Sequence, residues 1–249
     1  MPIEIIPLNE QAKGAFNQGE ILENKPIGFP QDGGKTKPYS NLFYWAHAFS
    51  NVDSIIGEHP HKGFEIMSFV LEGSIEHYDS KINDWITLNK GDVQIIRAGN
   101  GITHAEKLNA GAHIFQIWFD PDIRKTLNTN ASYNDYKENE LPIVDLKGIE
   151  KTIYKGSNAP LQMETEDVQI EKWKIKPGSH TVELTEQKTT SIYNLLNSCQ
   201  INGSASNKHD FLIINDENEL KIECNDELIL FVISTPVKPS YQTYFSLNN

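Results

Sequence analysis

The feature that most constrains the fold is a series of short apolar stretches separated by turn residues. Residues 65–71, 74–78, 85–88, 93–96 and 114–119 each have the length and the residue types of a β-strand. Glycine and asparagine residues interrupt the sequence between them at close spacing, which is typical of all-β barrels and sandwiches. The first of these stretches is apolar on both of its faces, so we expect it to lie between two packed layers.

The second half of the chain repeats this rhythm of strands and turns. Further strand-like stretches occupy residues 168–175, 191–201, 211–214, 219–224 and 228–234. We expect the polar segment 126–140 to connect the two halves, and no helix longer than a few turns. The rhythm makes the second half a candidate structural repeat of the first, with little residue identity between them. The sequence therefore predicts an all-β chain in two halves, long enough for two modest domains or one large β domain.

The composition argues against several classes of function. With 22 basic and 34 acidic residues, the net charge is −12, which disfavours a protein that binds the phosphate backbone of nucleic acids. No apolar run approaches the ~20 residues that a membrane helix needs, and the start of the chain has no signal-peptide pattern. Cys199 and Cys224 are far apart and lack C-x-x-C spacing, so we expect two reduced thiols rather than a disulfide or a thiolate zinc site. We expect a cytoplasmic monomer.

Four residues in two short segments carry the candidate chemistry. His59 and His61 lie two positions apart in one segment, and His104 and Glu106 lie two positions apart in the other. Side chains two apart on a strand point the same way. If the two strands are neighbours in a sheet, three imidazoles and a carboxylate come together, a donor set that suits Fe(II), Mn, Ni, Cu or Zn.

Three nearby residues have open roles. Glu65 is a second candidate for the carboxylate ligand; otherwise it orients a ligand histidine by accepting its ring N–H, or it pairs with a lysine or arginine. We interpret His77 as a structural histidine. Gln116 either lines the pocket or makes an ordinary hydrogen bond in the sheet. The second half contains no His-x-His and no His-x-Glu pattern, so we expect a single metal.

Five motifs in the first half resemble, in order and spacing, the pirin family of the cupin superfamily. They are His-Pro-His-Lys-Gly-Phe-Glu (59–65), Leu-Glu-Gly-Ser-Ile-Glu-His-Tyr-Asp-Ser (71–80), Gly-Asp-Val-Gln (91–94), Ala-Gly-Asn-Gly-Ile-Thr-His-Ala-Glu (98–106) and Gln-Ile-Trp (116–118). The loop 28–38 and the second half match the family poorly, which leaves the substrate more open than the metal site.

The resemblance implies two cupin barrels (double-stranded β-helix or jelly-roll) in one chain. Residues 1–130 would form the barrel with the metal and residues 131–249 a barrel without ligands. The ligands of the family fall on His59, His61, His104 and Glu106, which favours Glu106 over Glu65. The implied cofactor is one divalent transition metal, Fe(II) first, with Ni, Mn, Cu, Zn or Co as alternatives.

The resemblance also implies an activity. Some pirins are quercetin 2,3-dioxygenases, so we expect an oxidoreductase that opens the ring of a flavonol-like aromatic substrate with O2. Glu106 is then the candidate general base for the substrate hydroxyl. The alternative is a metal-dependent regulatory or binding protein without turnover, because the human pirin is described as a nuclear iron protein that modulates transcription.

A third interpretation is a cupin that stores or isomerises a sugar or keto acid. Clustered arginine and lysine side chains near the site would favour it. An apolar wall near Trp118 and Phe69 would argue against it.

Overall fold

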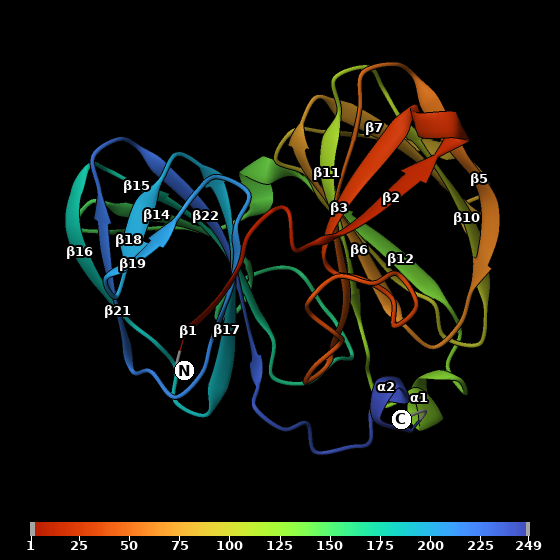
Figure 1. Ribbon diagram of the computed structural model, residues 1–249. Helices are drawn as coiled ribbons and strands as arrows, with labels where there is room; N and C mark the ends of the chain where they lie inside the picture. Colours follow the sequence, from red (N-terminus) through yellow and green to blue (C-terminus); the bar gives the residue numbers. More distant parts are fainter. Residues whose placement is uncertain (1–2, 248–249) are drawn as a thin grey trace. The chain divides into compact units, whose positions relative to one another are not determined.

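The computed structural model describes residues 3–247, which form two compact units, each built from two β-sheets (Figure 1). The first unit comprises residues 11–140 and 163–166 and the C-terminal segment from residue 239. The second unit comprises the N-terminal residues up to 10, together with 141–162 and 167–238. No pattern in the sequence indicates this interleaving. The ranges 1–130 and 131–249 stay a prediction about the limits of the two barrels.

The first unit contains a seven-stranded and a four-stranded sheet, and neighbouring strands are antiparallel. The larger sheet has the order β12 (Ser132–Tyr136), β9 (Val93–Arg97), β6 (Glu65–Glu72), β11 (His113–Phe119), β4 (Leu42–Ser50), β3 (Ile21–Ile27), β2 (Ala12–Phe16). The smaller sheet has the order β5 (Ser54–His61), β10 (Ile102–Leu108), β7 (Ser74–Asp79), β8 (Trp85–Asn89).

The second unit also contains a seven-stranded and a four-stranded sheet. The larger one has the order β1 (Ile3–Ile6), β20 (Phe211–Ile214), β17 (Lys188–Leu196), β22 (Leu228–Pro236), β15 (Gln169–Ile175), β14 (Ile149–Lys155), β13 (Ile143–Leu146). The smaller one has the order β16 (Gly178–Glu183), β21 (Glu219–Cys224), β18 (Cys199–Ile201), β19 (Ser204–Ser206).

The two units share one topology. When β4 is matched with β15 and the following strands are taken in sequence up to β11 and β22, every strand has the corresponding neighbours in both units. The outermost strand of the larger sheet is β12 in the first unit and β1 in the second. This correspondence confirms the structural repeat that the rhythm of the sequence predicted.

Two local predictions are wrong. The polar segment 126–140, expected to be a connection, contains β12, which pairs with β9 and extends the sheet of the first unit. The stretch 191–201, expected to be one strand, contains the end of β17 and all of β18, in different sheets. Asn197 lies between them with a φ of 62°, a left-handed conformation that ends the strand and turns the chain.

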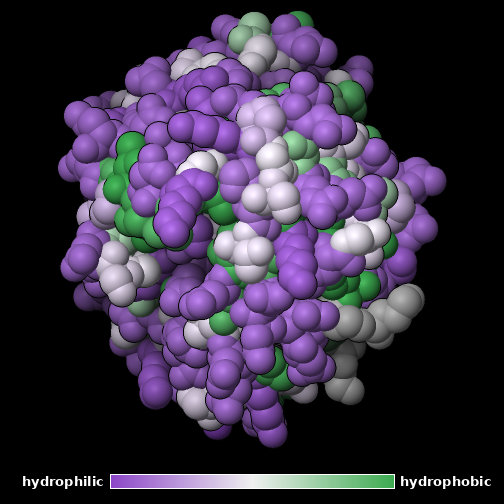
Figure 2. Space-filling model, turned by 90° about the vertical axis from the view of Figure 1, so that its left-hand side faces the viewer, coloured by the Kyte–Doolittle hydropathy of each residue, from purple (hydrophilic) through white to green (hydrophobic). Residues whose placement is uncertain are grey.

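The helical elements are short: η1 (Asn17–Gly19), α1 (Ile123–Thr126), η2 (Glu138–Glu140) and α2 (Tyr244–Leu247). Within residues 3–247, no helix has the length and hydropathy to cross a membrane. Aromatic and β-branched residues fill the interiors, and side chains such as Trp45, Phe115 and Phe231 are fully buried. Figure 2 shows one face of the molecule, where hydrophobic side chains gather in separate patches within a largely hydrophilic surface.

Candidate metal centre

The two histidine segments are neighbours in the smaller sheet of the first unit. Strand β10 pairs with β5 on one side and with β7 on the other. The register places His104 opposite His59 on β5 and opposite Asp79 on β7. It also places Glu106 opposite His77. The predicted adjacency of the two segments is therefore confirmed, and β7 adds a third strand of polar side chains.

Three imidazole nitrogens converge between these strands. Nε2 of His59 and Nε2 of His61 each lie 3.0 Å from Nε2 of His104. His104 is 1% exposed, whereas His59 and His61 are partly exposed. The three side chains thus form a group of potential metal ligands that is closed on the inner side and reachable at the other two histidines.

The protonation of these rings suits a cation. Nδ1 of His59 is 2.8 Å from the carbonyl oxygen of Gly57; because a carbonyl only accepts, Nδ1 carries the proton and Nε2 presents its lone pair. Burial, followed by the neighbouring imidazoles, lowers the pKa of both His61 and His104 to about 3. Neutral rings are the form that binds metal. One proton cannot bridge three mutually close nitrogens, but one cation can, so the donor set fits a divalent transition metal.

A row of polar side chains from the larger sheet holds the Glu106 carboxylate. Gln116 on β11, Ser68 on β6 and Gln94 on β9 lie opposite one another in register. Ser68 Oγ and Gln94 Nε2 donate to Oε1 of Glu106 at 2.6 and 3.1 Å. Gln116 Nε2 donates to Oε2 at 2.6 Å. Both carboxylate oxygens are therefore oriented by neutral donors, and Gln116 does more than hydrogen-bond within its own sheet.

His77 lies directly beside this carboxylate. His77, His104 and Glu106 form a second group of potential ligand atoms, all within 4.8 Å of one another and all buried. Nε2 of His77 lies 3.1 Å from Oδ2 of Asp79. Burial alone would raise the pKa of Asp79, but the hydrogen bonds from His77 and from two backbone N–H groups lower it. Among the described residues, Nδ1 of His77 has no hydrogen-bond partner, so Asp79 holds only one ring nitrogen, and the structural role of His77 stays a prediction.

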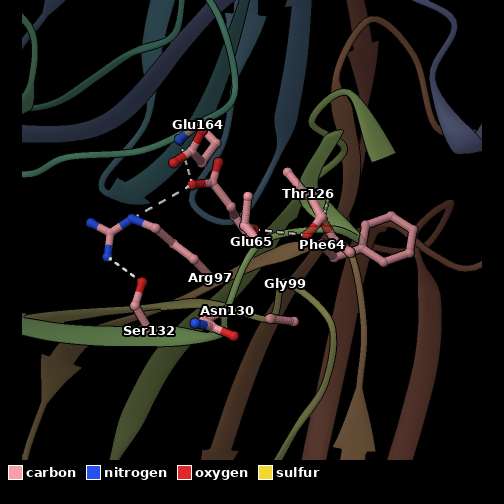
Figure 3. Close-up of a pocket in the computed structure, with 11 residues that line it drawn as sticks. Phe64, Glu65, Arg97, Gly99, Thr126, Asn130, Ser132 and Glu164 are labelled. Carbon is pink, nitrogen blue, oxygen red and sulfur yellow. Dashed lines mark hydrogen bonds and ion pairs between the residues drawn. The ribbon is translucent and has the colours of Figure 1, made fainter. Parts of the chain in front are cut away.

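The other candidate carboxylate, Glu65, anchors a distant segment. It accepts the N–H groups of Glu164 and Thr165 at 2.6 and 2.8 Å and the Thr165 hydroxyl at 2.5 Å. Arg97 Nε lies 3.9 Å away, at a small pocket beside β6 (Figure 3). Burial raises the pKa of Glu65. Glu65 belongs to neither group of potential ligands, and its contacts attach residues 163–166 to the first unit.

An aromatic surface adjoins the centre beside His61. The Trp118 ring meets the His61 ring edge-on, with centroids 4.7 Å apart. Rings of Phe29, Tyr44 and Phe64 lie 5.2, 5.6 and 5.8 Å from the Trp118 ring. An apolar wall near Trp118 argues against the sugar or keto-acid interpretation. Phe69, which was expected beside it, is buried in the core at 1% exposure.

The C-terminal segment packs on the same aromatic surface. The buried Asp120 carboxylate accepts the N–H groups of Tyr244 and Phe245 at 2.9 and 3.1 Å. The Tyr241 hydroxyl donates to the Asp120 carbonyl oxygen at 2.8 Å. The ring of Tyr244 then lies 5.4 Å from that of Phe64. Burial raises the pKa of Asp120 to about 6, and the two N–H donors oppose this rise.

Ser68 and Gln94 were missed in the sequence. The available signal was a polar residue inside an otherwise apolar, buried strand: Ser68 stands between Met67 and Phe69, and all three are buried. Buried polar side chains need hydrogen-bond partners, so such an interruption indicates that another polar group lies opposite. The sequence could not say that this group would be Glu106.

Two β-barrels of one topology in a single chain, with a histidine cluster inside one of them, define a bicupin with a candidate metal centre. A family model described as Pirin matches residues 34–119. A putative quercetin 2,3-dioxygenase of Pseudomonas aeruginosa is 31% identical over 70% of this chain and 75% of its own length. The quercetin 2,3-dioxygenase of Escherichia coli is 28% identical over 70% and 74%.

Among solved structures, the bacterial pirin YhhW of Escherichia coli in complex with nickel(II) has a TM-score of 0.76 at 23% identity, over 94% of this chain and 99% of that one. This likeness shows the fold. The chain belongs to the pirin family. The predicted fold class, all-β with two cupin barrels, is confirmed. The structure brings His59, His61 and His104 together and places Glu106 beside His104; their roles as ligands stay a prediction.

Proposed function

We propose that this chain is a metal-dependent dioxygenase that opens the ring of a flavonol such as quercetin with O2. The observation that carries the proposal is the convergence of three Nε2 atoms beside a carboxylate, next to an aromatic wall. The family relatives named quercetin 2,3-dioxygenase support the substrate class.

His59, His61 and His104 would hold the ion, with Glu106 as the fourth ligand. Bound there, a divalent metal supplies a Lewis acid and open positions for a chelating hydroxyl and for O2. Glu106 is the proposed acceptor of the flavonol hydroxyl proton. Both of its oxygens accept hydrogen bonds, Oε1 from Ser68 and Gln94 and Oε2 from Gln116, and these donors would orient the carboxylate at the site.

The spacing of the nitrogens favours a six-coordinate ion, for which we propose Fe(II). With metal–nitrogen bonds of about 2.1 Å, neighbouring donors lie about 3.0 Å apart on an octahedron and about 3.4 Å apart on a tetrahedron. Nε2 of His59 and Nε2 of His61 each lie 3.0 Å from Nε2 of His104. Nickel, manganese or cobalt satisfies the same spacing.

The aromatic surface would receive the flat substrate. Trp118 is only partly buried and stands edge-on to His61, so a planar ring system chelated at the ion can lie along its face. Stacked or edge-on aromatic contacts contribute about 0.5–1.5 kcal/mol each beyond the area that they bury. This surface favours a polyphenol over a sugar.

The test is oxygen uptake by the iron-loaded protein with quercetin, compared with two variants. We expect uptake by the wild type, none above background for His59→Ala, and wild-type uptake for His180→Ala, whose histidine lies on β16 of the second unit. A wild type that binds iron but takes up no more oxygen than His59→Ala contradicts the proposal. That result would favour the regulatory alternative.

A further inference from the structure

The two cysteines lie on neighbouring strands of the second unit. Strand β18 pairs with β21, with Gln200 opposite Glu223 and Ile201 opposite Ile222. One step further along the same antiparallel register places Cys199 opposite Cys224. Both cysteines are buried, at 6% and 7% exposure, in the hydrophobic cluster that also contains Ile201 and Ile222. The two thiols therefore share the inner face of the sheet, although 25 positions separate them in the sequence.

The register also gives the type of cross-strand pair. The N–H of Asn202 donates to the carbonyl of Lys221 at 2.9 Å, and the N–H of Lys221 donates to Oδ1 of Asn202 at 2.7 Å. The first of these bonds sets the phase of the ladder between β18 and β21. Hydrogen-bonded and non-hydrogen-bonded pairs alternate along an antiparallel ladder. Cys199 and Cys224 then form a non-hydrogen-bonded pair, with Cα atoms about 4.5 Å apart. A disulfide accepts Cα separations of about 4.4–6.8 Å, so the backbone allows this bond without rearrangement.

The surroundings distinguish the two thiols. Burial, followed by the charge of Cys224, raises the pKa of Cys199 to about 11, although a hydrogen bond with the Ser206 side chain opposes this rise. Burial also raises the pKa of Cys224, but the N–H of Gly178 on the adjacent strand β16 lowers it. The Cys224 thiol donates to the carbonyl of Lys176 at 3.5 Å, at the end of β21. Cys224 is thus the thiol better placed to react first, and Cys199 the one placed to resolve the product.

We propose that Cys199 and Cys224 are a peroxide-sensitive dithiol that closes to a cross-strand disulfide. In the first step, the Cys224 thiolate attacks one oxygen of hydrogen peroxide; the O–O bond breaks, hydroxide leaves, and a sulfenic acid forms. In the second step, the Cys199 thiolate attacks the Cys224 sulfur, the S–O bond breaks, and water leaves after proton transfer. Two thiols lose two electrons and two protons in total, and one peroxide is reduced to two waters.

The disulfide would bind β18 to β21 covalently within one barrel. It needs neither the metal nor turnover of a flavonol, so this inference is independent of the proposed function. Because burial raises both pKa values, the reaction is expected to be slow at pH 7 and several-fold faster at pH 9, where more thiolate is present.

The test is peroxide treatment of the full chain in the presence of a metal chelator, followed by acid quenching and intact mass spectrometry. We expect the monomer to lose the mass of two hydrogen atoms and to yield one linked peptide that contains Cys199 and Cys224. Reduction should restore the original mass. A product that gains oxygen on either cysteine, or that crosslinks two chains, overturns the proposal.

Two matched variants test the order of attack. Cys199→Ser removes the resolving thiol, so Cys224 should accumulate as a sulfenic acid that a dimedone probe labels. Cys224→Ser removes the first nucleophile, so labelling of Cys199 should be several-fold weaker at the same peroxide dose. Equal labelling in the two variants contradicts the assigned order, and no labelling in either, together with an unchanged wild-type mass, contradicts the dithiol itself.

Discussion

The two units have the same strand order, but the compared rows of their interiors are polar in one unit and apolar in the other. In the first unit, three residues that lie opposite one another on neighbouring strands of the larger sheet are polar: Gln116, Ser68 and Gln94. In the second unit, a row on the corresponding strands is apolar: Val232, Ile192 and Leu212. The smaller sheets differ in the same way. Strand β10 carries the buried His104 and Glu106, whereas the corresponding strand β21 carries the buried Leu220 and Ile222.

This difference shows which part of the sequence carries the fold and which part carries the site. Both interiors are buried, and both support the same arrangement of strands. A polar interior is stable only when its groups satisfy one another, and in the first unit Ser68, Gln94 and Gln116 meet Glu106. The candidate chemistry therefore depends on a few polar residues of the first unit. The topology itself does not require them, because the second unit has the same topology without them.

The largest effect should come from removing a histidine of the first interior. His104→Ala deletes the nitrogen that lies 3.0 Å from both His59 and His61, so we expect metal content to fall to background. Elemental analysis of the purified variant measures it. His209→Ala, in the second unit, serves as the control and should keep the wild-type content. Equal metal content in all three proteins would contradict the assigned centre.

A polar group in the apolar interior should have the next largest effect. Ile192→Ser on β17 leaves a cavity and buries a hydroxyl in an apolar row. We expect it to lower the free energy of unfolding by about 3 kcal/mol. Chemical denaturation measures the change, and Ile192→Val is the conservative control at about 1 kcal/mol. If Ile192→Ser were as stable as Ile192→Val, the contrast between the two interiors would be wrong.

Gln116→Ala should weaken metal binding without abolishing it. It removes the 2.6 Å hydrogen bond to Oε2 of Glu106 while leaving every proposed ligand in place. Loss of a residue that orients a metal ligand typically lowers the affinity by about 10–100-fold, and competition with a chelator measures this. The control is Val232→Ala at the corresponding row of the second unit, where the affinity should not change. Unchanged affinity in Gln116→Ala would mean that Glu106 is not a ligand.

The smallest effect is a pH dependence of the metal-free protein. Burial holds the pKa of His61 at about 3, below the usual 6.5, so in this range the unfolded chain binds more protons than the folded one. Stability should therefore fall as the pH falls from 6.5 toward 3. Between pH 7 and pH 6 the contribution of this histidine is about 0.7 kcal/mol. The free energy of unfolding of His61→Ala should decline less over this interval than that of the wild type; equal declines would contradict the assignment.

Local pattern predicted most of the strands and singled out the candidate residues, whose roles as ligands stay a prediction. The strands of the first half and the repeat in the second half follow from alternation and turn residues, whereas the pairing of the strands that carry His61 and His104 entered the sequence analysis only as a hypothesis. Contacts across long sequence separations were not predictable. Glu65 binds Thr165, 100 positions away, and Asp120 binds Tyr244. Both contacts hold a segment from the second half of the sequence in the first unit.

Neither of those contacts leaves a periodic signal. A carboxylate that accepts backbone N–H groups specifies no residue type in its partner, so Glu65 could equally have been a ligand from its sequence position alone. The neighbouring positions of Cys199 and Cys224 depend on the register of β18 against β21, which spacing in the sequence does not give. Local pattern predicts strands, whereas register between strands decides which side chains meet.

The most direct test of the account is anomalous diffraction from crystals of the nickel- or iron-loaded protein, measured at the absorption edge of the metal. We predict one strong peak, bonded to Nε2 of His59, His61 and His104 with a Glu106 oxygen beside it, and no peak inside the second barrel. A peak elsewhere, or intact histidines with no peak between them, would contradict the account.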